Sequence, residues 1–79
     1  MEDRDKFWKS AATEIRAEIA RRKTTYDEFS IQCGIHKSTL YARVQGHRPF
    51  NLEQLQQVLD ALGLTVTEFV IEVATRMEK

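Results

Sequence analysis

Basic residues are concentrated in one short stretch of the chain that contains no carboxylate. Between residues 31 and 50 the sequence holds Lys37, Arg43 and Arg48 but no Asp or Glu, and two hydroxyl residues follow Lys37 directly. Lysine and arginine can neutralise phosphates and donate to guanine, and serine and threonine hydroxyls can hydrogen-bond to base edges. These residue types point to the chemistry of polyanion binding.

The zero net charge of the whole chain argues against polyanion binding. The charge of the separate segments does not. Twelve Lys and Arg balance twelve Asp and Glu, so the formal net charge is zero. Residues 1–30 carry seven bases and seven acids, residues 31–50 have a balance of +3, and residues 51–79 have two bases against five acids, a balance of −3. Neutrality is therefore a sum of opposed segments, and Arg21, Arg22 and Lys23 are expected to extend the positive face.

Residues suited to catalysis or metal binding are few. Cys33 is the single cysteine, and His36 and His47 are separated by ten residues, which is not a metal-ligand spacing. The sequence contains no nucleophile and base at a spacing typical of a catalytic pair, and no Gly-rich phosphate loop. We therefore expect that the protein is not an enzyme and binds no metal or cofactor. Cys33 is expected to be a small buried hydrophobe.

The cysteine content and the apolar pattern of the sequence also indicate the cellular compartment. A lone cysteine fits a reducing compartment, and the charged N-terminus does not resemble a signal peptide. No apolar run approaches the roughly 18 residues that a membrane span needs. A cytoplasmic protein without membrane contact is therefore expected.

The pattern of apolar residues predicts an all-α chain. Its 79 residues fit a single domain, 1–79, and contain only three Gly and one Pro, with no alternation typical of strands. Helices are predicted at roughly 4–22, 26–33, 36–45, 52–62 and 65–77. The short connections between them indicate one compact bundle.

Capping patterns mark the starts of three of these helices. Thr25 with Glu28, Asn51 with Gln54 and Thr65 with Glu68 have the spacing of a reciprocal cap. Gly34, Gly46 and Gly63 follow the preceding helices, where a left-handed backbone costs little. The fourth helix is predicted to present one apolar side, formed by Leu52, Leu55, Val58, Leu59 and Leu62.

The second and third helices, joined at Gly34, carry a family resemblance. The stretch TYDEFSIQCGIHKSTLYARVQGHR resembles the helix-turn-helix of the Cro and phage-repressor-like (XRE) family. The matching positions are Thr25-Tyr26, Phe29-Ser30, Gly34-Ile35, Ser38-Thr39-Leu40 and Gly46, and the likeness covers about 24–69. It implies a compact five-helix bundle of the lambda-repressor-like type, with its helix-turn-helix unit at about 25–45.

Two positions depart from the family pattern. His36 stands where a Ser or Thr cap usually follows the turn, and Arg43 stands where an aliphatic residue is common. Val44 replaces that aliphatic residue and keeps an inward pair with Leu40. The departures bear on the orientation of the third helix more than on its existence.

The resemblance implies a role in DNA binding for the outward residues of the third helix, which would lie in the major groove. The residues expected to contact base edges are Lys37, Ser38, Thr39 and Ala42. Those expected to contact the DNA backbone, or to serve either role, are Thr25, Tyr26, Tyr41, Arg43 and Arg48. The N-terminus of the second helix is expected to favour a phosphate.

The last predicted helix has apolar residues on two sides. Val66, Phe69, Val70, Val73 and Met77 form one stripe, while Ile71 and Ala74 lie off it. A second apolar side suggests a dimer interface, for which the candidates are Phe69, Ile71, Val73 and Ala74. The first helix, with Trp8, is the rival interface.

These features lead to two hypotheses. The first is a sequence-specific transcriptional regulator that binds double-stranded DNA as a homodimer, most simply a repressor occluding a palindromic operator. The second is an antitoxin-like interaction module that neutralises a partner protein such as a toxin. The acidic residues of segment 51–79 would suit a basic partner.

Overall fold

Residues 2–78, the part of the chain that the structure describes, fold into five helices. The computed structural model describes the backbone of residues 2–78 and the side chains of residues 6–78, and all regular structure in this part of the chain is helical. The helices are α1 (Glu2–Arg21), α2 (Tyr26–Cys33), α3 (Lys37–Val44), α4 (Leu52–Leu62) and α5 (Val66–Met77). The prediction of an all-α chain is confirmed.

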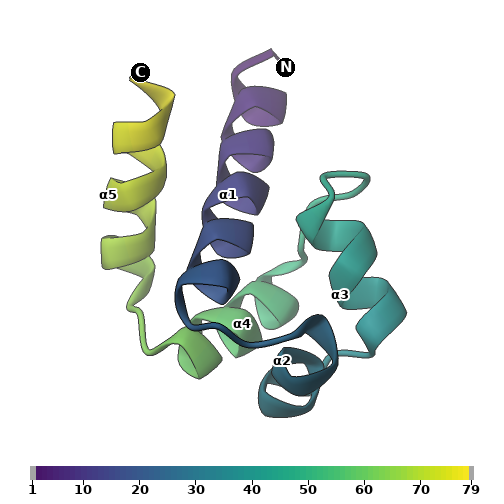
Figure 1. The fold of residues 1–79 in the computed structure, drawn as a ribbon. Helices are drawn as coiled ribbons and strands as arrows, with labels where there is room; N and C mark the ends of the chain where they lie inside the picture. Colours follow the sequence, from purple (N-terminus) through teal and green to yellow (C-terminus); the bar gives the residue numbers. More distant parts are fainter. Residues whose placement is uncertain (1, 79) are drawn as a thin grey trace.

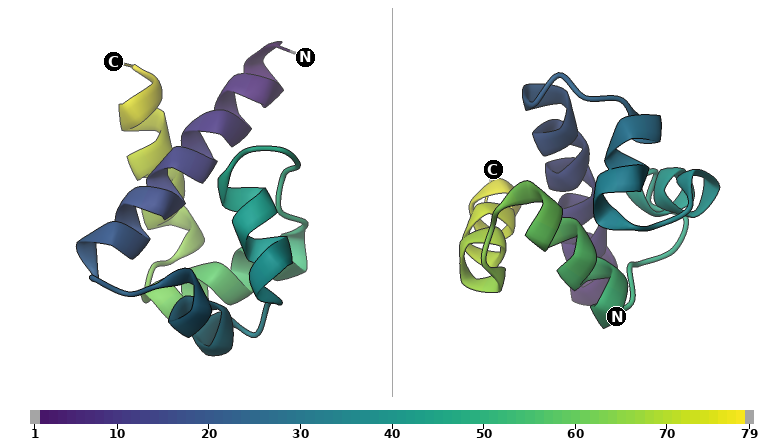
Figure 2. Two further views of the ribbon diagram at one scale, coloured as in Figure 1. Left: turned by 45° about the vertical axis from the view of Figure 1, so that its right-hand side comes forward. Right: turned by 90° about the horizontal axis from the view of Figure 1, so that it is seen from below.

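Helix α1 is the longest element and the others are arranged around it (Figure 1). Helix α5 packs along one side of α1, and α3 contacts α1 from another side. Helix α4 passes between α5 and α2, and α2 packs on both α3 and α4 (Figure 2). The radius of gyration is 11.7 Å, against about 11.6 Å expected for a compact chain of this length.

Local capping determines where the helices begin. Reciprocal side-chain caps are present at Thr25, Asn51 and Thr65, as their sequence spacing predicts. At the start of α3 the cap is His36, whose Nδ1 accepts a hydrogen bond from the Ser38 N–H at 3.2 Å. The histidine therefore serves the capping role of the hydroxyl residue that is usual in the resembled family.

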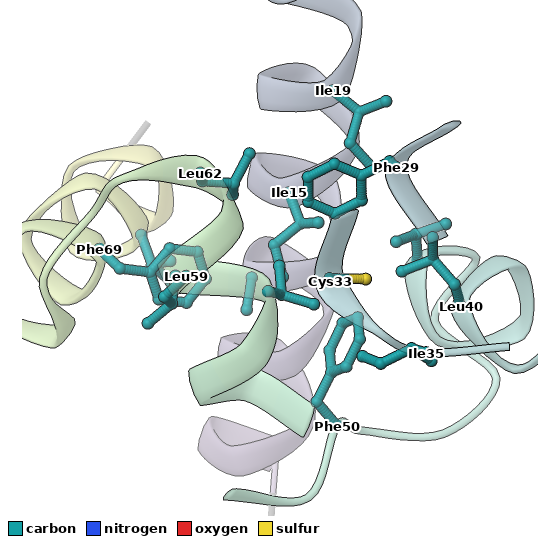
Figure 3. Close-up of a cluster of buried hydrophobic side chains, with 14 residues drawn as sticks. Ile15, Ile19, Phe29, Cys33, Ile35, Leu40, Phe50, Leu59, Leu62 and Phe69 are labelled. Carbon is teal, nitrogen blue, oxygen red and sulfur yellow. The ribbon is translucent and has the colours of Figure 1, made fainter. Parts of the chain in front are cut away.

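The core is built from all five helices and two connecting segments. Figure 3 shows Ile15, Phe29, Leu40, Leu59 and Phe69, one from each helix, and all five are fully buried. Other residues of the same buried cluster are Ile19, Cys33, Ile35, Val44, Phe50, Val58, Leu62 and Val73. The inward pair expected of Leu40 and Val44 is present, and Cys33 is buried as predicted.

One residue on the predicted apolar side of α4 lies outside the core. Leu52 is 85% exposed, although it shares a helix side with Leu55 and Leu59. Burial increases along α4 from Leu52, through half-buried Leu55, to fully buried Leu59. Periodicity identifies the apolar side of a helix but not how far its neighbours extend along it, so the first turn of α4 stays exposed.

Candidate nucleic-acid interface

A tight turn of three residues connects α2 to α3. Gly34 has a φ of 75° and donates its N–H to the Ser30 carbonyl at 2.9 Å. Ile35 is buried and donates to the same carbonyl at 3.2 Å. A left-handed residue followed by a buried anchor reverses the chain, so α3 begins directly over the end of α2.

Two side-chain contacts hold α2 and α3 together on their outer side. The rings of Tyr26 and Tyr41 meet edge to face, with centroids 5.4 Å apart and an angle of 85°. The Lys37 ammonium lies 2.9 Å from the Asp27 Oδ1. Both contacts link the first turn of α2 to α3, which fixes the crossing of the two helices.

The residues expected to contact bases lie on accessible parts of α3. Ser38 is exposed, and Thr39 and Ala42 are half-buried. Ser38 Oγ is 2.9 Å from His36 Nδ1, so this hydroxyl is oriented by the cap. Because Ala42 is one turn from both Ser38 and Thr39, these three residues form a small, uncharged outer row. The Lys37 ammonium pairs with Asp27.

The residues expected to contact phosphates are dispersed. Arg48 is exposed in the loop after α3, while Tyr26 is half-buried at the start of α2. The Thr25 hydroxyl accepts from the Glu28 N–H at 3.1 Å, and the Glu28 carboxylate accepts from the Thr25 N–H at 3.2 Å. The N-terminus of α2 thus already holds a carboxylate from its own chain.

Arg43 does not extend freely from α3. Its side chain is half-buried, and it lines a hollow with Trp8 and Lys9 of α1. Its Nε is buried and has no hydrogen-bond partner among the described residues. Arg43 therefore faces α1 and the loop that follows α3.

Arg21 and Arg22 do not extend the positive face as expected. Arg21 Nη2 lies 2.8 Å from Glu14 Oε2 and 2.9 Å from Glu18 Oε2. Arg22 pairs with Glu18 and also donates to the Leu62 carbonyl at the end of α4. Both guanidinium groups thus make ion pairs within the chain. The positions of the charged residues in the sequence did not reveal these pairs.

Sequence reasoning missed a cluster of three carboxylates between α1 and α5. Oxygens of Glu14, Glu18 and Glu72 lie within 4.8 Å of one another, and Arg76 Nη2 lies 2.9 Å from Glu14 Oε1. The spacing of Glu14 and Glu18 places both on one side of α1, but only the folded chain brings Glu72 beside them. Arginine pairing makes this cluster part of the α1–α5 contact.

The cluster shifts the pKa of each carboxyl group. Burial raises the pKa of Glu14, but hydrogen bonds from Arg76 and Arg21 outweigh it and hold the pKa below its ordinary value. At Glu18, Arg21 and Arg22 similarly outweigh burial and lower the pKa. At Glu72, burial, the hydrogen bond with Glu14 and the charges of Glu18 and Glu14 raise the pKa to about 7.

The four residues proposed for a dimer interface do not lie on one surface. Phe69 and Val73 are fully buried within the chain, between α5 and its neighbours. Ile71 is 60% exposed and Ala74 is also exposed. Phe69 and Val73 are therefore unsuitable as interface residues, because the chain's own core already covers them.

The outer side of α5 is mostly uncharged. Its exposed uncharged residues are Val66, Thr67, Val70, Ile71, Ala74 and Thr75. The exposed acid Glu68 reaches back to accept a hydrogen bond from the Thr65 N–H at 2.8 Å. The charged side chains Glu72 and Arg76 are directed toward α1 instead. We refer to these six exposed residues as the α5 outer face.

Among the described residues, no helix is both long and apolar enough to cross a membrane. No protein-family model, curated protein or solved structure gives a significant match to this chain.

Proposed function

We propose that the protein is a sequence-specific DNA-binding regulator of transcription that inserts α3 into the major groove. The observation that carries the proposal is the arrangement of α2 and α3. Two eight-residue helices joined by a tight turn present the outer row of Ser38, Thr39 and Ala42 on the second helix. Such a unit lets one helix cross the DNA backbone while the next reads base edges.

The outer row supplies compact groups for reading bases. Hydroxyls of Ser38 and Thr39 can donate or accept, and the methyl groups of Thr39 and Ala42 can contact a thymine methyl. Lys37 can reach guanine O6 and N7 once it leaves Asp27. Both members of that pair are more than half exposed, so separating them costs at most about 1 kcal/mol.

Phosphate contacts come from residues around this row. Arg48 is exposed in the loop after α3, and Tyr41 is 51% exposed beside Tyr26. These residues can position the unit on the duplex without reading its sequence. With so few cations available, a single copy would gain little affinity from charge alone, and pairing two copies doubles the contacts.

The α5 outer face is the surface proposed for this pairing. A two-fold dimer places the same surface against itself, so a face with few charges limits self-repulsion. The exposed acid beside this face, Glu68, is engaged by the Thr65 N–H. Exposed Val70 and Ile71 supply apolar area to bury. A dimer matches a palindromic site, and its binding over a promoter would repress transcription by occlusion.

Selection of bound duplexes from a pool of random sequences tests the proposal. Enrichment of one sequence with two inverted half-sites about one helical turn apart is the expected result. A pool that remains random after repeated rounds would contradict sequence-specific binding. The antitoxin-like alternative would then be the better reading of the exposed α5 face.

A further inference from the structure

A cavity lies beside α3, and among the proposed DNA contacts only Arg48 lies on its wall. It has a volume of about 260 Å³ and is enclosed by the first half of α1, the last turn of α3 and the loop 46–50. The loop stands next to α1 in Figure 1 and in the left view of Figure 2. The volume is close to the lower end of the range for small-molecule sites.

The charged residues on the cavity wall are all basic. Lys9, Arg43 and Arg48 line it, and none of the described lining residues is an Asp or Glu. Low-dielectric walls with charges of one sign concentrate the field inside a cavity. An anion is therefore the ligand that this wall would attract.

Arg43 gives a second indication of an anion. Its Nε is buried and has no hydrogen-bond partner among the described residues. A buried N–H that lacks a partner is costly, and more so on a charged group. A carboxylate inside the cavity would accept from this guanidinium and remove that cost.

Apart from Gly46 and His47, the remaining wall is apolar. Trp8 and Ala12 of α1 line one part, and Pro49 and Phe50 of the loop line another. An inorganic anion or a phosphodiester would leave these surfaces without apolar contact. A ligand with a planar apolar body would bury them and would pack against the Trp8 ring.

We propose that this cavity binds a small organic anion, a carboxylate carried on a planar apolar body, with Arg43 as its principal partner. The inference stands apart from the proposed function, because it concerns the free protein and requires no DNA. It assigns Arg43 to ligand binding instead of base or backbone contact.

Trp8 makes the cavity directly observable. It is the single tryptophan of the chain and lines the cavity, so its fluorescence reports on occupancy. Titration with benzoate should change that fluorescence saturably and shift the backbone amide signals of Gly46 and His47 in NMR spectra. Benzamide, a neutral analogue of similar shape, should bind at least tenfold more weakly, as should inorganic phosphate.

Variants test the role of the basic wall. Arg43→Met should weaken benzoate at least tenfold, and Lys9→Met, at an exposed position, at least threefold. Lys23→Met, in the loop before α2, is the matched control and should leave binding unchanged. Circular dichroism verifies that each variant is folded, and Lys9→Met keeps the test decisive where Arg43→Met unfolds the chain.

Several results would overturn the proposal. Equal affinity for benzoate and benzamide would show that the cavity does not select an anion. Phosphate binding as tightly as benzoate would assign the cavity to simple anions such as DNA phosphates. No saturable response to benzoate, or full affinity in folded Lys9→Met and Arg43→Met, would remove the site.

Discussion

The Lys37 ammonium lies 2.9 Å from Asp27 Oδ1, joining the first residue of α3 to the first turn of α2. The pair places a carboxylate beside the surface that we propose faces DNA. A phosphate or a guanine must compete with Asp27 for Lys37, and Asp27 itself would repel the duplex. The contact thus stabilises the α2–α3 crossing while opposing the proposed binding.

Replacing Asp27 tests this opposition. Asp27→Asn should raise the affinity for DNA about three- to tenfold, because it frees Lys37 and removes one negative charge from the interface. Fluorescence anisotropy with a labelled duplex at fixed salt measures the change.

Asp60→Asn is the matched control, since Asp60 is an exposed acid on α4. It changes the net charge by the same amount and should alter affinity by less than about twofold. Equal gains in both variants would show that only the total charge matters, which would contradict a specific role for Asp27.

The α5 outer face predicts a dimer that one charge can disrupt. Val70 is 43% exposed, so Val70→Glu should leave the monomer folded but place two carboxylates together at a two-fold interface. Sedimentation equilibrium should show a dimer for the unaltered chain and a 9.2 kDa monomer for the variant.

Gln56→Glu provides the control for added charge, because Gln56 is exposed on α4. This variant should remain dimeric. A 9.2 kDa species at every concentration of the unaltered chain would rule out the dimer.

Two leucines of α4 provide a matched test of the packing. Leu59 is fully buried and Leu52 is 85% exposed. Leu59→Ala should lower the free energy of unfolding by about 2 to 5 kcal/mol, through lost burial and a cavity. Leu52→Ala should change it by less than about 0.5 kcal/mol. Urea denaturation followed by circular dichroism measures both, and equal losses would contradict the arrangement of α4.

Glu72 predicts a loss of stability as the pH rises from about 4.5 to about 7. Its folded pKa is raised from 4.5 to about 7, so between these values the folded state holds a proton that the unfolded state has released. The stabilising contribution is fully present below pH 4.5 and is lost as pH rises through 7. The expected loss is at most about 3 kcal/mol.

Glu72→Gln should abolish this loss, because the amide cannot ionise. Urea denaturation between pH 5 and 9 measures the slope. Glu53→Gln, at an exposed position on α4, should retain the slope of the unaltered chain. A slope that persists in Glu72→Gln would assign the pH dependence to another group.

Local features of the fold could be predicted from the sequence. The caps at Thr25, Asn51 and Thr65 depend on residues three positions apart, and all three are present in the structure. The end of α2 at Gly34 is equally local, because it depends on one backbone conformation. The pairing of Leu40 with Val44 likewise follows from the helical period.

Contacts between distant segments could not be predicted in this way. Glu72 reaches Glu14 only because α5 packs along α1, and no spacing in the sequence encodes that approach. The orientation of Arg43 toward Trp8 depends on how the loop after α3 returns to α1. In the candidate interface, the sequence indicated the residue types on α3 but not that Asp27 would engage Lys37.

The ratio of affinities for a selected duplex and its scrambled counterpart, measured at one salt concentration, tests the central claim most directly. Sequence-specific binding by α3 predicts a ratio of about a thousand or more, which Lys37→Ala combined with Thr39→Ala should reduce to nearly one. A ratio near one for the unaltered chain at every salt concentration would contradict the account.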